Sequence, residues 1–367
     1  MDDKLKFPKK VVQKIEKSSY IINTMESLSQ IFNLYQYFLS RDLHDNKNEL
    51  SSDFKEYMKN LWENDNKIFT PMAFMKKLIK ISNAFSCKEE LDPYNYYHYI
   101  LKKLNDELNG KDLKITKDFE NLKNKFQNDE YLNKFLEKYI KENNSFISQT
   151  FYGIMKITKT CDYCRGNEET EYQKFDIIDI DIFGFCNYMH LEGHSLTNFY
   201  LDDCIDYYFD KDKTKEEYPC PTDLCKGKER QKKYDRKLIE LPNYLIIRIN
   251  WGDFENNKGF KCEIKGVKPS YQYLEVDEII EIKKDYCEDE SYNVDKPIED
   301  SIKYKLFSTI DYFINDDEKL IFITKYRIKE KGKTDRWYNF WCNATGKEKG
   351  TYIDHFTTPY LLFYEKI

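Results

Sequence analysis

The sequence predicts an α+β protein in which a helical N-terminal part precedes a part built mainly of strands. Between about residues 13 and 140, apolar side chains recur every three or four positions, which is the period of an amphipathic helix. From about residue 150 the period changes to two, which is typical of half-buried strands. Two pairs of closely spaced cysteines lie in this second part. We therefore expect helices first, a cysteine-bearing region next and a sheet last.

Length and composition limit the class of protein. With 367 residues the chain can bury a large core, and its 31 Tyr and 25 Phe indicate an aromatic-rich core rather than disorder. The formal net charge of -6 argues against nucleic acid as the main partner. No run reaches the roughly 18 apolar residues that span a bilayer, and the N-terminus lacks a secretory signal. We expect an intracellular protein, cytoplasmic or nuclear, without a membrane partner.

Four segments of the first part have the helical period. The apolar positions that define them are Met25, Leu28, Ile31 and Phe32, then Phe54, Met58 and Leu61, then Phe74, Leu78 and Ile81, then Tyr96, Ile100, Leu104 and Leu108. Thr70 and Pro71 predict the start of the third segment, because a proline at the first helical position loses no hydrogen bond. The chain is therefore expected to be mainly helical up to about residue 140.

The second part begins with alternating residues. From Phe175 to Ile182, apolar side chains alternate with Asp176, Asp179 and Asp181. This pattern fits a single half-buried strand whose acidic residues lie on the wet side. Further strands are predicted at 238 to 250, 276 to 283, 302 to 313, 319 to 328, 336 to 341 and 359 to 364.

Two charged segments interrupt the strands. Residues 226 to 233 are rich in Lys and Arg, and we interpret them as a solvated turn, with a partner-binding patch as the alternative. The acidic segment from Asp285 to Asp300 is expected to be an exposed loop inserted between strands. Neither segment by itself assigns a function.

The four paired cysteines have the spacing of metal ligands. Two residues separate Cys161 from Cys164, and four separate Cys220 from Cys225. Four thiolates arranged in this way predict a structural Zn²⁺ site that holds together strands too small to fold on their own. The alternatives are that the four are free thiols or that the site has lost its metal. Cys204 is the expected substitute ligand if one member of a pair fails.

The order of these features resembles the catalytic domain of the ubiquitin-specific proteases, from about residue 17 to residue 367. The matching segments are Ser195 to Asp202, Leu241 to Ile249, Tyr304 to Leu306, Trp337 to Phe340 and Tyr360 to Tyr364. The resemblance implies one domain over residues 1–367 with the papain-like fold of that family. Its parts would be a helical thumb at 15–145, fingers with the zinc site at 150–237 and a β palm at 238–367. In that family the fingers grip the globular body of ubiquitin.

The residues that carry out catalysis in that family are missing. The resemblance requires a cysteine nucleophile in the segment Ser18 to Ser27, which contains none. Depending on where a short gap is placed, the nucleophile position falls on Ser19, Tyr20 or Asn23. The histidine that deprotonates the nucleophile corresponds to Phe322, and phenylalanine cannot accept a proton. The resemblance therefore implies a protein without catalytic residues.

Other parts of the family's site are altered as well. Asn343 fits the residue that orients the histidine, but the histidine itself is missing. Asp92 is kept from the segment beside the cleft for the ubiquitin tail, without its flanking glutamine and glutamate. Ile321 replaces a glycine, so side chains are expected to fill the slot for the two glycines of the tail. We expect weak or absent binding of the tail, with a residual grip on the body of ubiquitin.

Three functions remain. The first is a catalytically inactive scaffold or docking module in a larger protein complex, for which the inactive subunit of the spliceosomal tri-snRNP is a precedent. The alternative is an active deubiquitinating cysteine protease with a rearranged site, for which Cys87 and His98 form the only sequence-near pair. The third is a ubiquitin-binding protein without catalysis. We interpret Cys87 and Cys342 as core thiols and His98 as a structural residue. The other histidines are His44, His190, His194 and His355.

Overall fold

The computed structural model describes residues 18–41, 50–63, 71–85, 91–110, 122–124, 126–165, 168–192, 198–210, 215–220, 222–255, 259–261, 273–288, 301–314, 320–328, 336–340, 349–350 and 357–367. The chain forms two compact units, each assembled from separate stretches. Unit 1 comprises Met1–Asn109, Gly252–Glu263 and Phe307–Phe363, and unit 2 comprises Gly110–Trp251, Ile264–Leu306 and Tyr364–Ile367. No helix among the described residues is long and apolar enough to cross a membrane.

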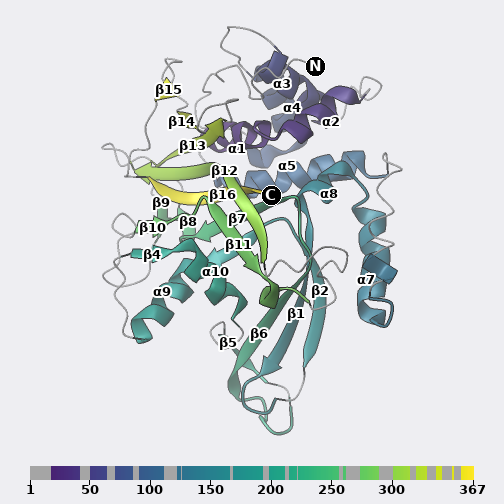
Figure 1. Cartoon of the computed structure of the whole chain (residues 1–367), viewed down its shortest axis with the longest axis vertical. Helices are drawn as coiled ribbons and strands as arrows, with labels where there is room; N and C mark the ends of the chain where they lie inside the picture. The colour runs from purple at the N-terminus through teal and green to yellow at the C-terminus, as the bar shows by residue number, and fades with distance from the viewer. Residues whose placement is uncertain are drawn as a thin grey trace. The chain divides into compact units, whose positions relative to one another are not determined.

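The N-terminal part is helical, as the period of its apolar residues predicts. The helices of unit 1 are α1 (Ser19–Ser29), α2 (Phe32–Ser40), α3 (Leu50–Glu63), α4 (Met72–Ile81), the 3-10 turn η1 (Asn83–Phe85) and α5 (Pro93–Leu108) (Figure 1). Pro71 lies just before α4 and not at its first helical position, because its ψ of 37° is outside the helical range. Its carbonyl still accepts the first hydrogen bond of the helix, from the amide of Met75.

Aromatic side chains hold the helices of unit 1 together. The ring of Tyr20 in α1 packs edge-on against that of Tyr96 in α5, with centroids 6.0 Å apart. The rings of Phe38 in α2 and Phe54 in α3 lie 4.7 Å apart. All four side chains are fully buried, and each contributes roughly 2–3 kcal/mol through the apolar surface it removes from water. The abundance of aromatic residues therefore serves the core.

The sheet of unit 1 has the strand order β15-β14-β13-β12-β16. These strands are β12 (Ser301–Ile314), β13 (Leu320–Ile328), β14 (Arg336–Phe340), β15 (Lys349–Gly350) and β16 (Thr358–Lys366), and a separate hairpin joins β8 (Asp253–Glu255) to β9 (Gly259–Lys261). β12 pairs antiparallel with β13, so that Ser308 lies opposite Tyr326 and Ile310 opposite Thr324. Helix α1 lies against the face of β13 (Figure 1). The boundary between the two units falls within β12 and β16.

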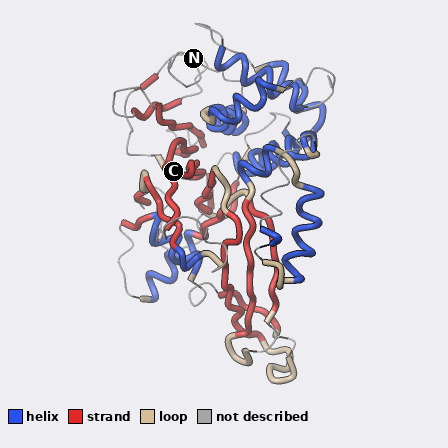
Figure 2. The backbone as a smooth tube through the Cα atoms, turned by 45° about the vertical axis from the view of Figure 1, so that its right-hand side comes forward, coloured by secondary structure: helices blue, strands red, loops and turns tan. Residues whose placement is uncertain are grey.

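Unit 2 combines helices with a second group of strands (Figure 2 draws helices blue and strands red). Its elements are α7 (Glu130–Glu142), α8 (Phe146–Phe151), β1 (Gly153–Cys161), β2 (Glu169–Phe175), β3 (Ile178–Asp181), α9 (Ile182–Leu191), β4 (Asn198–Tyr200), α10 (Leu201–Phe209), β5 (Lys215–Pro219), β6 (Glu229–Glu240), β7 (Tyr244–Asn250), β10 (Tyr273–Glu275), β11 (Ile279–Lys283) and the 3-10 turn η3 (Lys284–Tyr286). An antiparallel sheet has the order β2-β1-β6-β5, and β3 pairs parallel with β7.

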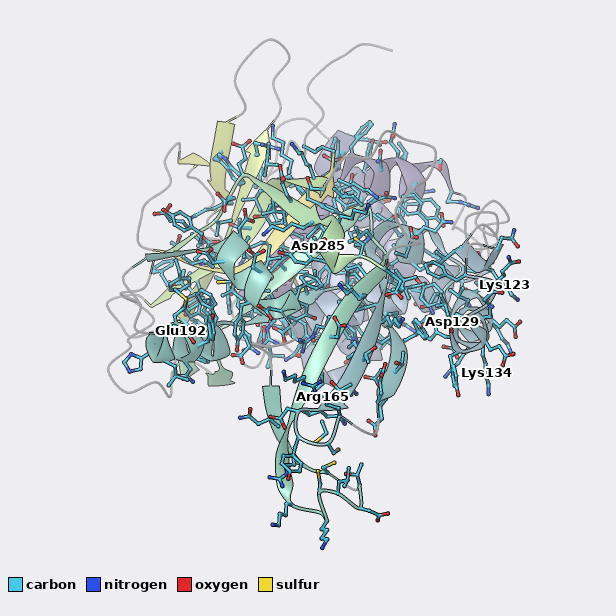
Figure 3. All side chains as sticks on the ribbon, turned by 60° about the horizontal axis from the view of Figure 1, so that its bottom comes forward. Lys123, Asp129, Lys134, Arg165, Glu192 and Asp285 are labelled. Carbon is cyan, nitrogen blue, oxygen red and sulfur yellow. The ribbon has the colours of Figure 1, made fainter. Side chains whose placement is uncertain are left out.

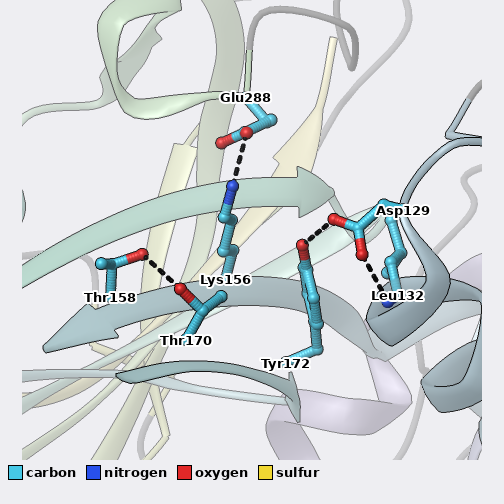
Figure 4. Close-up of polar contacts among 7 residues, drawn as sticks. All are labelled: Asp129, Leu132, Lys156, Thr158, Thr170, Tyr172 and Glu288. Atoms are coloured by element: carbon cyan, nitrogen blue, oxygen red, sulfur yellow. Dashed lines mark hydrogen bonds and ion pairs between the residues drawn. The ribbon is translucent and has the colours of Figure 1, made fainter. Parts of the chain in front are cut away.

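Polar side chains fasten helix α7 to the edge of this sheet (Figure 4). Asp129 caps α7 by accepting a hydrogen bond from the amide of Leu132 at 2.8 Å, and its other carboxylate oxygen accepts one from the hydroxyl of Tyr172 on β2. On β1, Lys156 forms an ion pair of 2.8 Å with Glu288. These polar side chains therefore attach α7 to β2, and Glu288 to β1.

The predicted strand from Phe175 to Ile182 is wrong in its extent. β2 ends at Phe175, and the alternation holds only in β3, where Ile178 and Ile180 are buried. Asp181 ends that strand, because its carboxylate accepts hydrogen bonds from the amides of Phe183 and Gly184 and so caps α9. The acidic residue that indicated the wet side of a strand is a helix cap.

Two other strand-region predictions also change. The segment 238 to 250 forms two strands, β6 and β7, because Pro242 in the turn between them cannot donate to a ladder. The acidic segment is not exposed throughout, since Asp285 is exposed but Tyr286 is buried and its ring stacks on that of Phe209 with centroids 4.5 Å apart. Residues 289 to 300 lie outside the described residues. The strands predicted near β11, β12, β13, β14 and β16 are confirmed.

Candidate metal centre and the contact between α1 and β13

Strand pairing in unit 2 brings the four predicted ligands together. Cys161 ends β1, Cys164 lies in the turn that follows, and Cys220 directly follows β5. Cys225 lies in the turn before β6, which pairs with both β1 and β5. The two cysteine-bearing turns therefore meet at one end of the sheet. Figure 3 shows this end, with Arg165 labelled and sulfur atoms in yellow beside it.

The four sulfur atoms have the spacing of a tetrahedral metal site. All lie within 4.8 Å of one another, and no other group of this kind occurs among the described residues. The Sγ atoms of Cys161 and Cys225 are 3.9 Å apart, and those of Cys164 and Cys220 are 3.8 Å apart. A Zn–S bond of about 2.3 Å in a regular tetrahedron places the sulfurs about 3.8 Å apart. The four thiols thus fit Zn²⁺, and they are far too distant for disulfides.

Both cysteine-bearing turns contain residues in the left-handed backbone region. Arg165 follows Cys164 with φ 48°, and Lys226 follows Cys225 with φ 49°. The amide of Arg165 donates to the carbonyl of Cys161 at 3.1 Å, and that of Gly227 to the carbonyl of Cys220 at 3.2 Å. The two turns thus close in similar ways around their cysteine pairs. Of the lysine- and arginine-rich residues 226 to 233, only 226 to 228 lie in the second turn, because β6 begins at Glu229.

Cys204, the predicted substitute ligand, is not part of the cluster. It is fully buried in α10 and does not belong to the group of four sulfurs. Burial, followed by the neighbouring Cys186, raises the pKa of the Cys204 thiol well above its usual range. A thiol held protonated in this way is a poor metal ligand. The four cysteines of the two pairs complete the donor set without it.

The second site is the contact between α1 and β13 in unit 1. The amide nitrogen of Asn23 donates to the carbonyl of Phe322 at 3.0 Å and to that of Ser19 at 2.8 Å. The hydroxyl of Thr324 lies 2.8 Å from the side-chain oxygen of Asn23 and 3.1 Å from its carbonyl. Asn23, Phe322 and Thr324 are all buried. These residues form a closed polar contact that fixes the helix on the strand.

The structure distinguishes the three candidate nucleophile positions. Asn23 is the side chain that contacts the strand carrying Phe322. Tyr20 instead packs among the helices, with its ring 6.2 Å from that of Phe85, and Ser19 supplies a carbonyl to Asn23. An amide, a threonine hydroxyl and a phenylalanine ring offer neither a thiolate nor a proton acceptor. Described residues at this contact therefore provide none of the groups that thiol catalysis needs.

Asp92 has a structural reason to be present. Its carboxylate caps α5 by accepting a hydrogen bond from the amide of Tyr94 at 2.8 Å, and it accepts another from the hydroxyl of Tyr360 on β16 at 2.5 Å. The side chain is buried, and both oxygen contacts are within unit 1. Asp92 thus fixes α5 to the sheet, which is a structural role that needs no bound ligand.

The remaining predicted site residues fall in two groups. His98 lies exposed on α5 with its ring 6.4 Å from that of Tyr94, and Ile321 is half-buried on β13. His190 is exposed on α9. The others lie outside the described residues, namely His44, Cys87, His194, Cys342, Asn343 and His355. The proposed pair of Cys87 and His98 therefore has one described member.

Sequence reasoning missed a buried ion pair in unit 1. Lys325 of β13 lies 2.7 Å from the carboxylate of Asp311 on β12, and both side chains are at most 10% exposed. The hydroxyl of Thr357 donates to Asp311 at 2.9 Å and accepts from Lys325 at 2.5 Å. Asp311 is the only acidic residue of β12, and Lys325 is one of two basic residues of β13. Their pairing could not be deduced, because it depends on the register of the two strands, in which Lys325 lies opposite Thr309 and not opposite Asp311.

Comparison with known proteins places this geometry in a family. The family described as "Ubiquitin carboxyl-terminal hydrolase" matches residues 13–364. Ubiquitin carboxyl-terminal hydrolase 15 of Xenopus tropicalis is 26% identical over 157 residues, which are 40% of this chain and 16% of that protein. The chain thus aligns with only about a sixth of that relative's length.

Solved structures share the fold. The Ubp8/Sgf11/Sus1/Sgf73 DUB module of SAGA, bound to ubiquitin aldehyde, contains a chain with a TM-score of 0.61 and 14% identity, covering 100% of this chain and 71% of that one. A yeast SAGA DUB module with a mutant Sgf73 gives a TM-score of 0.61 and 13% identity, covering 100% and 70%. These likenesses confirm the α+β fold predicted from the sequence. Taken with the family match over nearly the whole sequence, they show that the chain belongs to the ubiquitin carboxyl-terminal hydrolase family of ubiquitin-specific proteases.

Proposed function

We propose that this chain is a catalytically inactive ubiquitin-specific protease domain that serves as a scaffold or docking module in a protein complex. The observation that carries the proposal is the contact of Asn23 with Phe322. It joins the two elements that would bear the family's nucleophile and base, and it is made by the side-chain amide of Asn23 and the main-chain carbonyl of Phe322. The contact is buried and fully hydrogen-bonded, so it stabilises the fold without serving a reaction.

The proposal includes a structural zinc ion held by Cys161, Cys164, Cys220 and Cys225. The spacing of the four sulfurs supports it. When bound, Zn²⁺ would supply folding energy to the end of the sheet and no reaction chemistry, since four protein ligands leave no open position. We propose that residues 150–237 form the fingers of the domain, beside a helical thumb at 15–145 and a β palm at 238–367.

The similar SAGA structures support the partner class. Their titles name a module of several subunits, in one case bound to ubiquitin aldehyde. By analogy we propose that other protein subunits are the main partners of this chain, inside the cell, and that any contact with ubiquitin is weak. Affinity purification of the tagged full chain from its native organism, followed by mass spectrometry, should recover a stable set of such subunits.

Catalysis is tested with a ubiquitin probe. Purified protein is incubated with ubiquitin vinyl sulfone, which traps a reactive thiol, and turnover of ubiquitin-rhodamine is followed. We expect neither labelling nor turnover. Turnover that disappears in the variant Cys87→Ser would contradict the proposal and support the rearranged protease. Titration of labelled free ubiquitin separates a dedicated ubiquitin-binding protein, which binds it tightly, from the scaffold, which does not need to.

A second experiment asks whether the two replaced positions alone explain inactivity. The double variant Asn23→Cys, Phe322→His places a thiol and an imidazole on the two elements that the Asn23 contact joins. We still expect no labelling by ubiquitin vinyl sulfone, because Ile321 stands where the family has a glycine beside the ubiquitin tail. Labelling of the double variant but not of the wild type would show that the tail slot is open.

A further inference from the structure

Two side chains outside the cysteine set lie beside the sulfur cluster. The hydroxyl of Thr222 lies 3.3 Å from the Sγ of Cys164 and 3.3 Å from the Sγ of Cys220. One hydroxyl thus contacts one sulfur from each cysteine pair. The guanidinium of Arg230, on β6, lies beside Cys225. Neither residue belongs to the spacing pattern that predicts the site.

Arg230 also contacts the first cysteine pair through an aromatic ring. Its guanidinium carbon lies 4.2 Å from the centroid of the Tyr163 ring, and Tyr163 stands between Cys161 and Cys164. Tyr163 is 64% exposed, and the guanidinium of Arg230 lies over one face of its ring. Arg230 therefore bridges the first turn, through Tyr163, and the second turn, through Cys225.

Charge explains why such contacts matter. Four thiolates around Zn²⁺ carry a net charge of about −2, which hydrogen-bond donors and cations must offset. Amides of the two turns donate to carbonyl oxygens, for example those of Asp162 to Gln231, Lys226 to Thr222 and Lys228 to Cys225. These bonds set the shape of the turns. The hydroxyl of Thr222 contacts two of the sulfurs themselves, and the guanidinium of Arg230 brings a positive charge beside the cluster.

We propose that Thr222 and Arg230 are positioning residues that join the two cysteine pairs and slow the loss of the metal, with Tyr163 holding Arg230 in place. The inference rests on the zinc site proposed above. It adds that the site depends on residues from both turns and from β6, beyond its four ligands. Outer contacts of this kind typically change metal affinity by about 10- to 100-fold.

The chain offers matched controls for each change. Thr158, on β1, has its hydroxyl 3.3 Å from that of Thr170 and does not touch a sulfur cluster member in any described contact. Arg236, also on β6, stacks on Tyr208 with its guanidinium carbon 4.7 Å from the ring centroid. Thr158→Val and Arg236→Met therefore remove the same groups from the same sheet away from the four cysteines.

The experiment measures release of zinc from the purified full chain to excess chelator. We expect Thr222→Val and Arg230→Met each to release zinc about ten times faster than the wild type. Thr222→Ser, which keeps the hydroxyl, should stay near the wild-type rate, and Tyr163→Ala should resemble Arg230→Met. In the Co²⁺-substituted protein, the thiolate-to-cobalt absorption band should shift in Thr222→Val and stay unchanged in Thr158→Val. A purely structural role of Thr222 would not shift this band.

The outcomes separate this inference from the zinc proposal. Zinc release from Thr222→Val and Arg230→Met at the rate of Thr158→Val and Arg236→Met would overturn the inference and leave the zinc site standing. A wild-type chain purified without bound zinc, and unable to take it up, would overturn both. Faster release in the two test variants, together with the cobalt shift, would establish the positioning role.

Discussion

The sulfur cluster of unit 2 and the contact between α1 and β13 in unit 1 differ in what they keep. The cluster keeps all four donor atoms at distances that suit a metal. The contact joins helix and strand through the side-chain amide of Asn23 and the main-chain carbonyl of Phe322. The difference shows which requirement each region meets. The cluster presents four donor atoms that fit a structural metal, whereas the helix–strand contact consists of packing and satisfied hydrogen bonds.

The largest difference between the two regions should appear when one of the four cysteines is removed. Cys161→Ser should lower the zinc content of the purified chain to less than about a tenth, since structural zinc sites contribute on the order of 10 kcal/mol to folding. The lysines from 226 onward should then become sensitive to trypsin. Zinc analysis and limited proteolysis check this. Cys204→Ser is the control, because Cys204 lies outside the cluster, and equal zinc loss in both variants would contradict the four-sulfur site.

The next largest effect is expected at the other region. Asn23→Ala should lower the free energy of unfolding by about 2–4 kcal/mol, because it leaves the hydroxyl of Thr324 and the carbonyl of Phe322 buried with fewer partners. Denaturant unfolding measures it. Asn60→Ala is the control, since its amide bonds to Glu56 on the exposed side of α3, and it should change stability by less than about 0.5 kcal/mol. A small effect at Asn23 would mean that this contact does not hold the helix.

A third prediction concerns Asp92, which joins α5 to β16 within unit 1. Asp92→Ala should cost about 2 kcal/mol of unfolding free energy, because α5 loses its cap and Tyr360 loses its acceptor. Tyr360→Phe should cost about 1 kcal/mol, since only the second bond is removed. Thermal or denaturant unfolding distinguishes the two. Asp92→Ala without loss of stability would point to a retained role in binding.

The smallest expected effect is on the pH dependence of stability, and it comes from Asp202 of unit 2 and not from the cysteines. Burial, then the carboxylates of Asp277 and Asp206, raise the pKa of Asp202 to about 6. Because the folded-state value is raised, ionised Asp202 lowers stability above about pH 6, and this loss disappears as the pH falls toward 4. Asp202→Asn should therefore be more stable than the wild type at pH 7.5 by about 1 kcal/mol or less, since solvent screens this exposed residue. A difference that stays constant from pH 4 to pH 8 would contradict this assignment.

Local patterns carried most of what the sequence could predict. The helical period, the confirmed strands and the pairing of the cysteines are all written within a few neighbouring residues. Asp181 misled the strand prediction because a carboxylate that caps a helix looks like one on the wet face of a strand. The bond of Asn23 to Phe322 joins residues 299 positions apart in the chain. The pairing of Lys325 with Asp311 depends on the register of two consecutive strands. No local pattern contains either kind of information.

Arg165 and Lys226 adopt a left-handed backbone that costs most side chains about 1 kcal/mol each relative to glycine. With two long cationic side chains in such positions, the metal-free turns should leave this conformation easily. A bound ion would therefore hold the turns in shape as well as join them. A chain engineered with glycine at both places should keep its loop geometry better during demetallation. Resistance to chelators could then be adjusted without touching a single sulfur.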